Sequence, residues 1–360
     1  MHSLVKSRKD FLQKLGSRWA LLFLGIEVVF FSVAAFGFLR INTIQIIFFF
    51  GTAVFLMGTA ELFVIITGGI DLSVGYVMGF SSIVSAKLIA WMSLSGIDPL
   101  ISIIIGVLMT LVIGLIPGYI NGIIISQLHV PPFIATFSML GISHGLSELL
   151  VQDHAAKNLP YLASAIGNGY FIYIVPGKVV TFFSRPEVAR GVKVISLIPN
   201  VVVISFIVIA ICAFILKRTK FGQHTYAIGG NEDAAIRSGI NIKKHITKIY
   251  MLSSFLASLA GVIYTLKYIT GKADAGAASL LDSIAAVVIG GASLYGGKGT
   301  VWRTILGGTI IAVLDTGLRV MGIPTFDKYI IVGIILVAAV LIDQIFPEVT
   351  YEESVDELPD

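Results

Sequence analysis

Apolar runs long enough to cross a lipid bilayer follow one another along almost the whole chain. They cover residues 19–39, 44–66, 73–91, 101–125, 131–151, 195–216, 249–269, 280–295, 304–322 and 328–346. A membrane-spanning helix uses about 20 mainly apolar residues, so runs of this length predict transmembrane helices. The sequence therefore predicts an all-α polytopic membrane protein with ten such segments, some of them short or broken.

The composition supports this fold class and argues against soluble ones. Residues of the types AVILMFWYC make up 56% of the chain, and charged residues make up only 13%, about half of the usual fraction. A net charge of +4 is small for 360 residues, which argues against a nucleic-acid-binding module. The one cysteine, Cys212, excludes a disulfide or a cysteine metal cluster formed within the chain.

The distribution of Lys and Arg predicts the orientation of the chain. Residues 1–18 form a basic N-terminus, and residues 217–248 contain seven Lys or Arg against two acids. Because cytoplasmic segments are enriched in Lys and Arg, both are expected in the cytoplasm, with an even number of spans between them. The same parity makes 152–194 an extracytoplasmic loop and 347–360 an acidic cytoplasmic tail, which flanks a transmembrane domain over 19–346.

One glycine pattern occurs twice. Gly68–Gly75 and Gly290–Gly297 both read G-G-x-x-L-x-x-G. The neighbouring runs 73–91 and 280–295 are short or interrupted by glycine, which in transporters is typical of broken or re-entrant helices. The repetition indicates two loosely related halves, and chance repetition in a chain with 37 glycines is the alternative.

The cytoplasmic loop contains the signals of a short helix. Gly229 and Gly230 favour a turn, and Asn231 is a common N-cap residue. The two acids that follow would lie in the first turn, where the helix dipole favours them, and Gly239 can close the C-terminus. A helix this short buries little surface alone, so we expect it to dock into a partner; a solvated surface loop is the alternative.

Four stretches of the chain resemble the permease subunits of bacterial ATP-driven monosaccharide importers of the ribose, xylose, galactose and arabinose group. They are Ile66–Gly75, Pro132–Thr136, Ala227–Ile240 and Leu281–Gly291, within a likeness that covers residues 44–346. The resemblance implies that the short loop helix is the coupling helix that docks on a separate ATP-hydrolysing subunit. The residues to which it gives this role are Gly229, Gly230, Asn231, Glu232, Asp233, Ala234, Ala235, Arg237, Ser238 and Gly239.

The resemblance further implies a permease that passes a monosaccharide from an extracytoplasmic binding protein to the cytoplasm by alternating access. The implied partners are an ATP-binding subunit, that binding protein, and a second permease copy or a homologue, in the bacterial inner membrane. No cofactor is expected on this chain, since ATP and Mg²⁺ would be held by the partner, and the chain is not expected to be an enzyme.

The segment of this chain most similar to an ATP-binding loop, Gly297–Gly299, has no hydroxyl residue after the lysine. Residues 152–194 are longer than the corresponding loop of the family.

A carrier driven by an ion gradient is the alternative function, because such carriers keep titratable groups within the membrane. The candidates are Glu27, Glu61, His144, Glu148, Asp282 and Asp315, and for each a structural hydrogen-bonded role is favoured. An intramembrane serine protease has the least support, a partial G-x-S-x match at Ser293.

Sugar hydroxyls need hydrogen-bond partners during passage, so a weakly polar pathway is expected. The candidate lining residues are Asp71, Ser73, Asn121, Thr136 and Ser138. Hydrogen bonds to the backbones of neighbouring helices are the alternative role for each of them.

Overall fold

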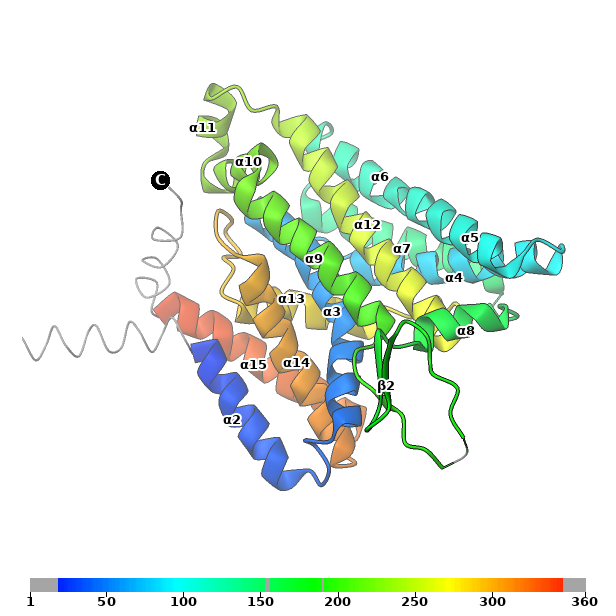
Figure 1. Cartoon of the computed structure of the whole chain (residues 1–360). Helices are drawn as coiled ribbons and strands as arrows, with labels where there is room; N and C mark the ends of the chain where they lie inside the picture. The colour runs from blue at the N-terminus through cyan, green and yellow to red at the C-terminus, as the bar shows by residue number, and fades with distance from the viewer. Residues whose placement is uncertain (1–18, 153–155, 190, 346–360) are drawn as a thin grey trace, which may run out of the picture.

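The computed structural model of this chain describes residues 19–152, 156–189 and 191–345 (Figure 1). The first helices are α2 (Trp19–Ala34), α3 (Ile41–Ile66), α4 (Val74–Leu94), α5 (Pro99–Ile113), α6 (Leu115–Ser126), α7 (Pro132–Val151) and α8 (Tyr161–Asn168). After the strands β1 (Ile172–Val175), β2 (Val179–Phe182) and β3 (Ile195–Ser196) come α9 (Asn200–Arg218), α10 (Lys220–Gly230), α11 (Glu232–Arg237), α12 (Ile242–Tyr268), α13 (Ala277–Ile289), α14 (Val301–Val320) and α15 (Thr325–Ile345). The basic N-terminus and the acidic tail lie outside the described residues.

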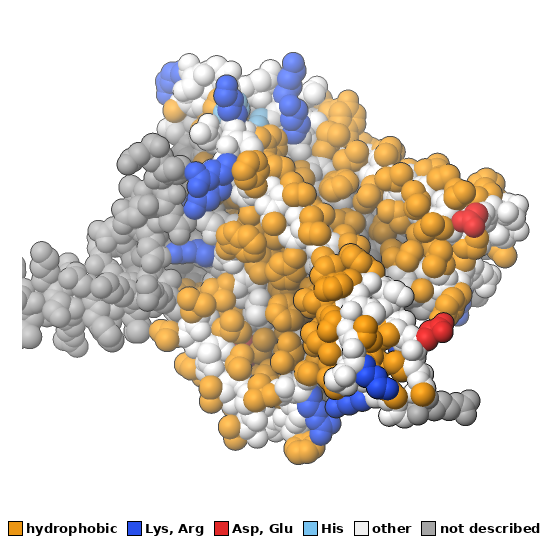
Figure 2. Space-filling view, viewed as in Figure 1, with side chains coloured by type: hydrophobic (Ala, Val, Ile, Leu, Met, Phe, Trp, Pro, Cys, Tyr) orange, Lys and Arg blue, Asp and Glu red, His pale blue; other side chains and the backbone are white. Residues whose placement is uncertain are grey.

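Seven helical segments in the described part of the chain are long and apolar enough to cross a membrane. They are α3, α4, the continuous pair α5–α6, α7, α9, α12 and α14. With the shorter apolar helices α2 and α13, and with α15, they account for the ten predicted segments and confirm an all-α polytopic membrane protein. Figure 2 shows the outer surface that such a fold needs, a face covered mainly by apolar side chains, with Lys and Arg gathered toward its ends.

Helices α3 and α12 form the centre of the bundle. From Val54 to Ile66 every residue of α3 is buried, and α12 is buried along most of its length. A helix that is apolar on all sides is expected to be enclosed by other helices. By contrast, α5–α6, α7 and α9 expose many apolar side chains, as expected of helices at the periphery of a membrane protein.

The chain between α12 and α13 runs without regular structure along α4. Two glycines of α4 permit this close approach, since a Cβ added to Gly79 would lie 1.9 Å from the carbonyl oxygen of Ala273, and one added to Gly75 would lie 2.7 Å from that of Gly276. The predicted irregularity of 280–295 is confirmed, because α13 has only 13 residues. The run 73–91 differs from expectation: α4 is a continuous helix of 21 residues, and the break precedes it.

The two copies of the glycine pattern end α3 and α13 in the same way. Gly68 has φ +80° and Gly291 has φ +83°, a left-handed conformation that favours glycine after a helix. The next residue in each copy, Gly69 or Ala292, donates its N–H to the carbonyl oxygen five residues earlier, at 3.1 and 3.2 Å. The structural equivalence is offset by one residue from the sequence repeat, since Gly68 corresponds to Gly291.

The long loop predicted on the outer side forms a small structured cap. It contains α8 and an antiparallel sheet of strand order β2-β1-β3, in which Tyr173 pairs with Thr181 and Ser196. The cap extends past the predicted boundary at residue 194, since β3 is formed by Ile195–Ser196 and α9 begins only at Asn200. The side-chain amide of Gln45 in α3 donates to the carbonyl oxygen of Leu197 at 2.9 Å, which fastens the cap to the bundle. The cap lies at the end of the bundle opposite α10 and α11 (Figure 1).

Candidate functional site

The predicted loop helix is present as α11, directly after α10. The side-chain oxygen of Asn231 accepts a hydrogen bond from the backbone N–H of Ala234 at 2.8 Å, which makes Asn231 the N-cap. Gly239 has φ +82°, and the N–H of Ile240 donates to the carbonyl oxygen of Ala235 at 3.1 Å, which closes the C-terminus. One detail differs from expectation: Gly229 and Gly230 are the last residues of α10 and not a free turn.

The surface of α11 is open to contact. Ala235 is buried against the bundle, whereas Glu232, Asp233, Ala234 and Arg237 are exposed. Ile236, which the sequence analysis did not single out, is also exposed, at 54%. A branched apolar side chain among exposed charges is suited to contact with a partner protein, because burying it there removes apolar surface from water.

The segment α10 joins α11 to the core of the bundle at the two glycine breaks. The backbone N–H of Gly297 donates to the carbonyl oxygen of Ile66 at 2.8 Å. Gly229 lies against both, since a Cβ added there would be 1.6 Å from that oxygen and 2.6 Å from that nitrogen. The hydroxyl of Tyr226 donates to the carbonyl oxygen of Gly299 at 2.6 Å. These contacts connect α10 with the end of α3 and with the loop between α13 and α14.

Three of the five predicted pathway residues form one buried polar cluster with Ser253. The carboxylate of Asp71 accepts hydrogen bonds from the N–H of Ser73 at 3.0 Å and from the hydroxyl of Ser253 in α12 at 2.7 Å. The amide of Asn121 in α6 donates to the hydroxyl of Ser73 at 3.2 Å. These bonds hold the loop after α3 against α6 and α12. The N–H of Asp71 also donates to the carboxylate of Glu61 at 3.3 Å.

The other two predicted pathway residues lie on α7. The hydroxyl of Thr136 donates to the carbonyl oxygens of Pro132 at 2.9 Å and of Ile70 at 3.2 Å, so it adjoins the same loop. Ser138 is exposed and donates to Ile134 of its own helix at 2.8 Å, away from the cluster. A lining role for these five residues stays a prediction.

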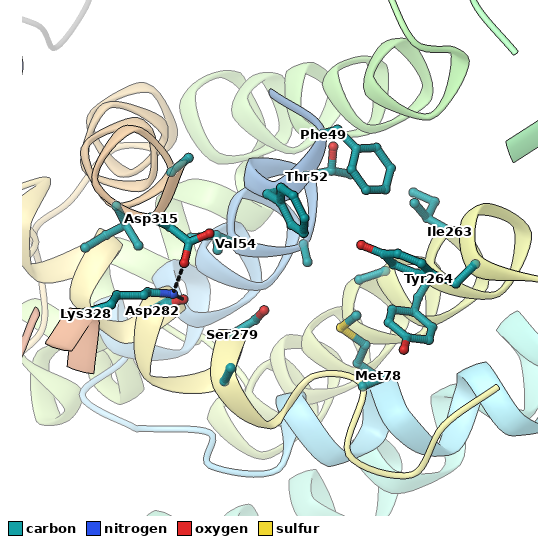
Figure 3. A pocket seen from close by; sticks show the side chains of 18 of the residues that line it. Phe49, Thr52, Val54, Met78, Ile263, Tyr264, Ser279, Asp282, Asp315 and Lys328 are labelled. Atoms are coloured by element: carbon teal, nitrogen blue, oxygen red, sulfur yellow. Dashed lines mark hydrogen bonds and ion pairs between the residues drawn. The ribbon is translucent and has the colours of Figure 1, made fainter. Parts of the chain in front are cut away.

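A cavity of about 230 Å³ lies elsewhere in the bundle, between α3, α12, α13, α14 and α15 (Figure 3). Its polar and aromatic lining consists of Phe49, Phe50, Thr52, Tyr264, Tyr268, Ser279, Asp282, Asp315, Arg319 and Lys328. None of the five predicted pathway residues lines it.

One wall of this cavity is an ionic network. The ammonium of Lys328 lies 2.7 Å from a carboxylate oxygen of Asp282 and 3.2 Å from one of Asp315. Arg319 donates to Asp315 at 2.8 Å, one helical turn away in α14. Both acids were among the residues predicted from the sequence, but neither base was. The available signal was that the last three apolar runs contain bases, Arg319 and Lys328, as well as acids.

The remaining titratable candidates are dispersed. His144 and Glu148 approach each other at 3.4 Å on α7, where both side chains are partly exposed. Glu27 is buried in α2, and neither of its carboxylate oxygens has a hydrogen-bond partner among the described residues. None of the described hydrogen bonds connects these groups with the ionic network or with the Asp71 cluster.

Comparison with known proteins gives a consistent result. A family described as branched-chain amino acid transport system / permease component matches residues 43–340. The ribose import permease protein of Bacillus subtilis is 36% identical over 284 residues, 78% of each chain. The D-allose transport system permease protein of Escherichia coli is 32% identical over 320 residues, 89% of each chain. The fructose import permease protein of Rhizobium meliloti is 30% identical over 344 residues, 95% of this chain and 89% of that one. No solved structure matches. The chain belongs to this family of multi-pass transport permeases, within the group whose curated relatives are permeases of sugar import systems.

Proposed function

We propose that this chain is the permease subunit of an ATP-driven importer in a bacterial inner membrane, and that it passes a monosaccharide to the cytoplasm by alternating access. Two copies, or this chain and a homologue, enclose the pathway. A sugar-loaded binding protein docks on the outer side, and ATP is bound with Mg²⁺ and hydrolysed by a separate subunit. The permease itself holds no cofactor.

The observation that carries this proposal is the exposed, capped helix α11 together with its contacts to the bundle. The helix is fixed at both ends, presents Ile236 between charges, and continues into α10. Gly229 in α10 lies in contact distance of Ile66 and Gly297. When the ATP-binding subunits close, they move α11, and α10 carries the movement to the two glycine breaks. The sugar specificity is supported by the relatives named above.

The ion-gradient carrier has weaker support in the arrangement of the titratable groups. Such carriers use chains of carboxylates or histidines along the transport route. Here Asp282 and Asp315 form ion pairs with Lys328 and Arg319, so they are engaged in a structural network.

Reconstitution with the cognate ATP-binding subunit tests the proposal. The wild-type chain in lipid vesicles should raise ATP hydrolysis when a binding protein loaded with one sugar from a panel is added, and sugar should accumulate inside. Ala234→Trp, on the exposed face of α11, should abolish both effects while membrane insertion is unchanged, because the bulky side chain blocks docking. Lys243→Ala is the matched control, since one exposed charge contributes at most about 1 kcal/mol.

Two results would contradict the proposal. One is normal ATP-driven uptake by Ala234→Trp. The other is uptake by the wild-type chain that follows an imposed proton or sodium gradient without ATP, which would assign the chain to the carrier class.

A further inference from the structure

We infer that the cavity between α3, α12, α13, α14 and α15 is a monosaccharide contact site within each copy of the chain; this inference rests on the proposed function. Its volume of about 230 Å³ is below the roughly 300–1,000 Å³ of sites for drug-sized ligands, so its occupant is small. The backbone, the charges and the aromatic side chains around the cavity each restrict that occupant further.

The backbone at the cavity indicates contact with water. Residues 269–276 belong to no helix or named strand, and Ala273 and Gly276 pack against Gly79 and Gly75 of α4. Irregular backbone within a membrane is tolerated only where protein buries it or where it lines a water-filled space. Here α4 covers one side of the segment, while Ala275 and, in the first turn of α13, Ser279 line the cavity on the other. In transporters, short helices of this kind commonly border the solute site.

The charges at the cavity favour a neutral solute. Asp282 and Asp315 contribute two negative charges, and Lys328 and Arg319 two positive ones, so the charges of the lining sum to zero. Each of the four forms an ion pair with at least one of the others, at nitrogen–oxygen distances of 2.7–3.2 Å. None of these charges therefore needs an ionic ligand to balance it. Each carboxylate has acceptor sites beyond the bonds that it makes to the bases, and these can receive hydroxyl donors from a solute.

Aromatic side chains form the wall opposite the ionic network (Figure 3). The rings of Tyr264 and Tyr268 lie 4.6 Å apart, and Phe49 contacts Tyr268 at 6.2 Å between ring centroids. A monosaccharide has C–H groups that pack on aromatic faces and hydroxyls that need polar partners. A site with an aromatic wall facing a few polar groups matches both requirements.

Part of the lining lies toward the predicted outer side. Tyr268 and Phe50 line the cavity and are 43% and 37% exposed. Tyr268 is the last residue of α12, next to Lys267, whose carbonyl oxygen accepts a hydrogen bond from Asn168 of the outer cap at 3.0 Å. A sugar released by a binding protein on that side would reach the cavity before the cytoplasmic half of the bundle.

The single native cysteine allows a direct test. In a Cys212→Ala background, Ser279→Cys places a thiol on the cavity wall, and Leu94→Cys places one on an exposed position at the end of α4, away from the cavity. Each variant is reconstituted with the ATP-binding subunit and treated from outside with a cationic, membrane-impermeant methanethiosulfonate. ATP-driven uptake is measured before and after treatment. The labelling rate is measured with D-ribose, D-allose, D-xylose or L-leucine present.

Labelled Ser279→Cys should lose uptake by about tenfold or more, which corresponds to about 1.4 kcal/mol, whereas labelled Leu94→Cys should keep it. At least one of the three sugars, and not leucine, should slow the labelling of Ser279→Cys only. Undiminished uptake by labelled Ser279→Cys, or a labelling rate that no sugar changes, would overturn the inference. Protection by leucine alone would overturn it too. Failure of the untreated background to couple uptake to ATP would instead refute the proposed function, so the two failures are distinguishable.

Discussion

The ammonium of Lys328 in α15 lies 2.7 Å from the carboxylate of Asp282 in α13, and both side chains are buried. The two residues are separated by the whole of α14, which adds Asp315 to the same cation at 3.2 Å. Three helices are thus held together by one positive charge.

Replacing that charge should destabilise the bundle strongly. Lys328→Met leaves two buried carboxylates with only Arg319, and breaking a buried ion pair in this way costs about 3–5 kcal/mol. The double variant Lys328→Met/Asp282→Asn restores charge balance and should recover most of the loss. The measurement is the midpoint of thermal unfolding in detergent for both variants. Equal midpoints for the single and the double variant would show that charge balance is not the cause.

The Asp71 cluster should be sensitive to the loss of one hydroxyl. Ser253→Ala removes the donor at 2.7 Å from a buried carboxylate oxygen, and an unsatisfied buried group costs about 1–3 kcal/mol. Ser138→Ala is the control, since its hydroxyl bonds only within its own helix at an exposed position, and its effect should stay within about 0.5 kcal/mol. Thermal unfolding of both variants compares them. A control that loses as much stability as Ser253→Ala would contradict this ranking.

The N-cap residue of α11, Asn231, should affect binding of the ATP-binding subunit. Asn231→Ala removes the N-cap and costs about 1 kcal/mol of helix stability, so we expect weaker association, whereas Asn231→Asp keeps an acceptor and should bind as the wild type does. The association constant with the chain held in lipid nanodiscs is the measurement. Equal weakening by both variants would indicate that the amide contacts the partner directly and does not act through the cap.

Gly229 should tolerate no side chain. Gly229→Ala places a Cβ within 1.6 Å of the carbonyl oxygen of Ile66, so the end of α3 or α10 must move, and the unfolding midpoint should fall. Gly230→Ala, one residue later, meets no atom within 4 Å and should leave the midpoint unchanged. A fall of the same size in both variants would mean that helix-end flexibility, and not the close contact, is what matters.

The sequence predicted the features that depend on local patterns. The apolar runs predicted the helices because their length and hydropathy are properties of neighbouring residues. The ends of α11 were predicted for the same reason, since Asn231 and Gly239 act on the backbone of their own helix. The continuity of α4 was missed because glycine lowers helix propensity but is accepted where another segment must come close, as at Gly75 and Gly79.

The cavity could not be predicted because its parts come from distant positions. Tyr264, Ser279 and Lys328 belong to different helices, and periodicity within a helix says nothing about which neighbour it meets. The Asp71 cluster was partly anticipated, since Asp71 and Ser73 are adjacent in sequence, but Ser253 comes from a helix far along the chain. Ile236 was missed because an isolated isoleucine in a short helix has the pattern of a core residue.

The contact of Ile66, Gly229 and Gly297 joins an early, a middle and a late part of the chain. Proteins are made from the N-terminus onward, so the bundle cannot complete this junction until residue 297 has left the ribosome. An incomplete product that stops before that residue would carry α11 without the support beneath α10. The junction beneath α10 is therefore among the last contacts of the bundle to form during synthesis, although two of its three segments of chain are made much earlier.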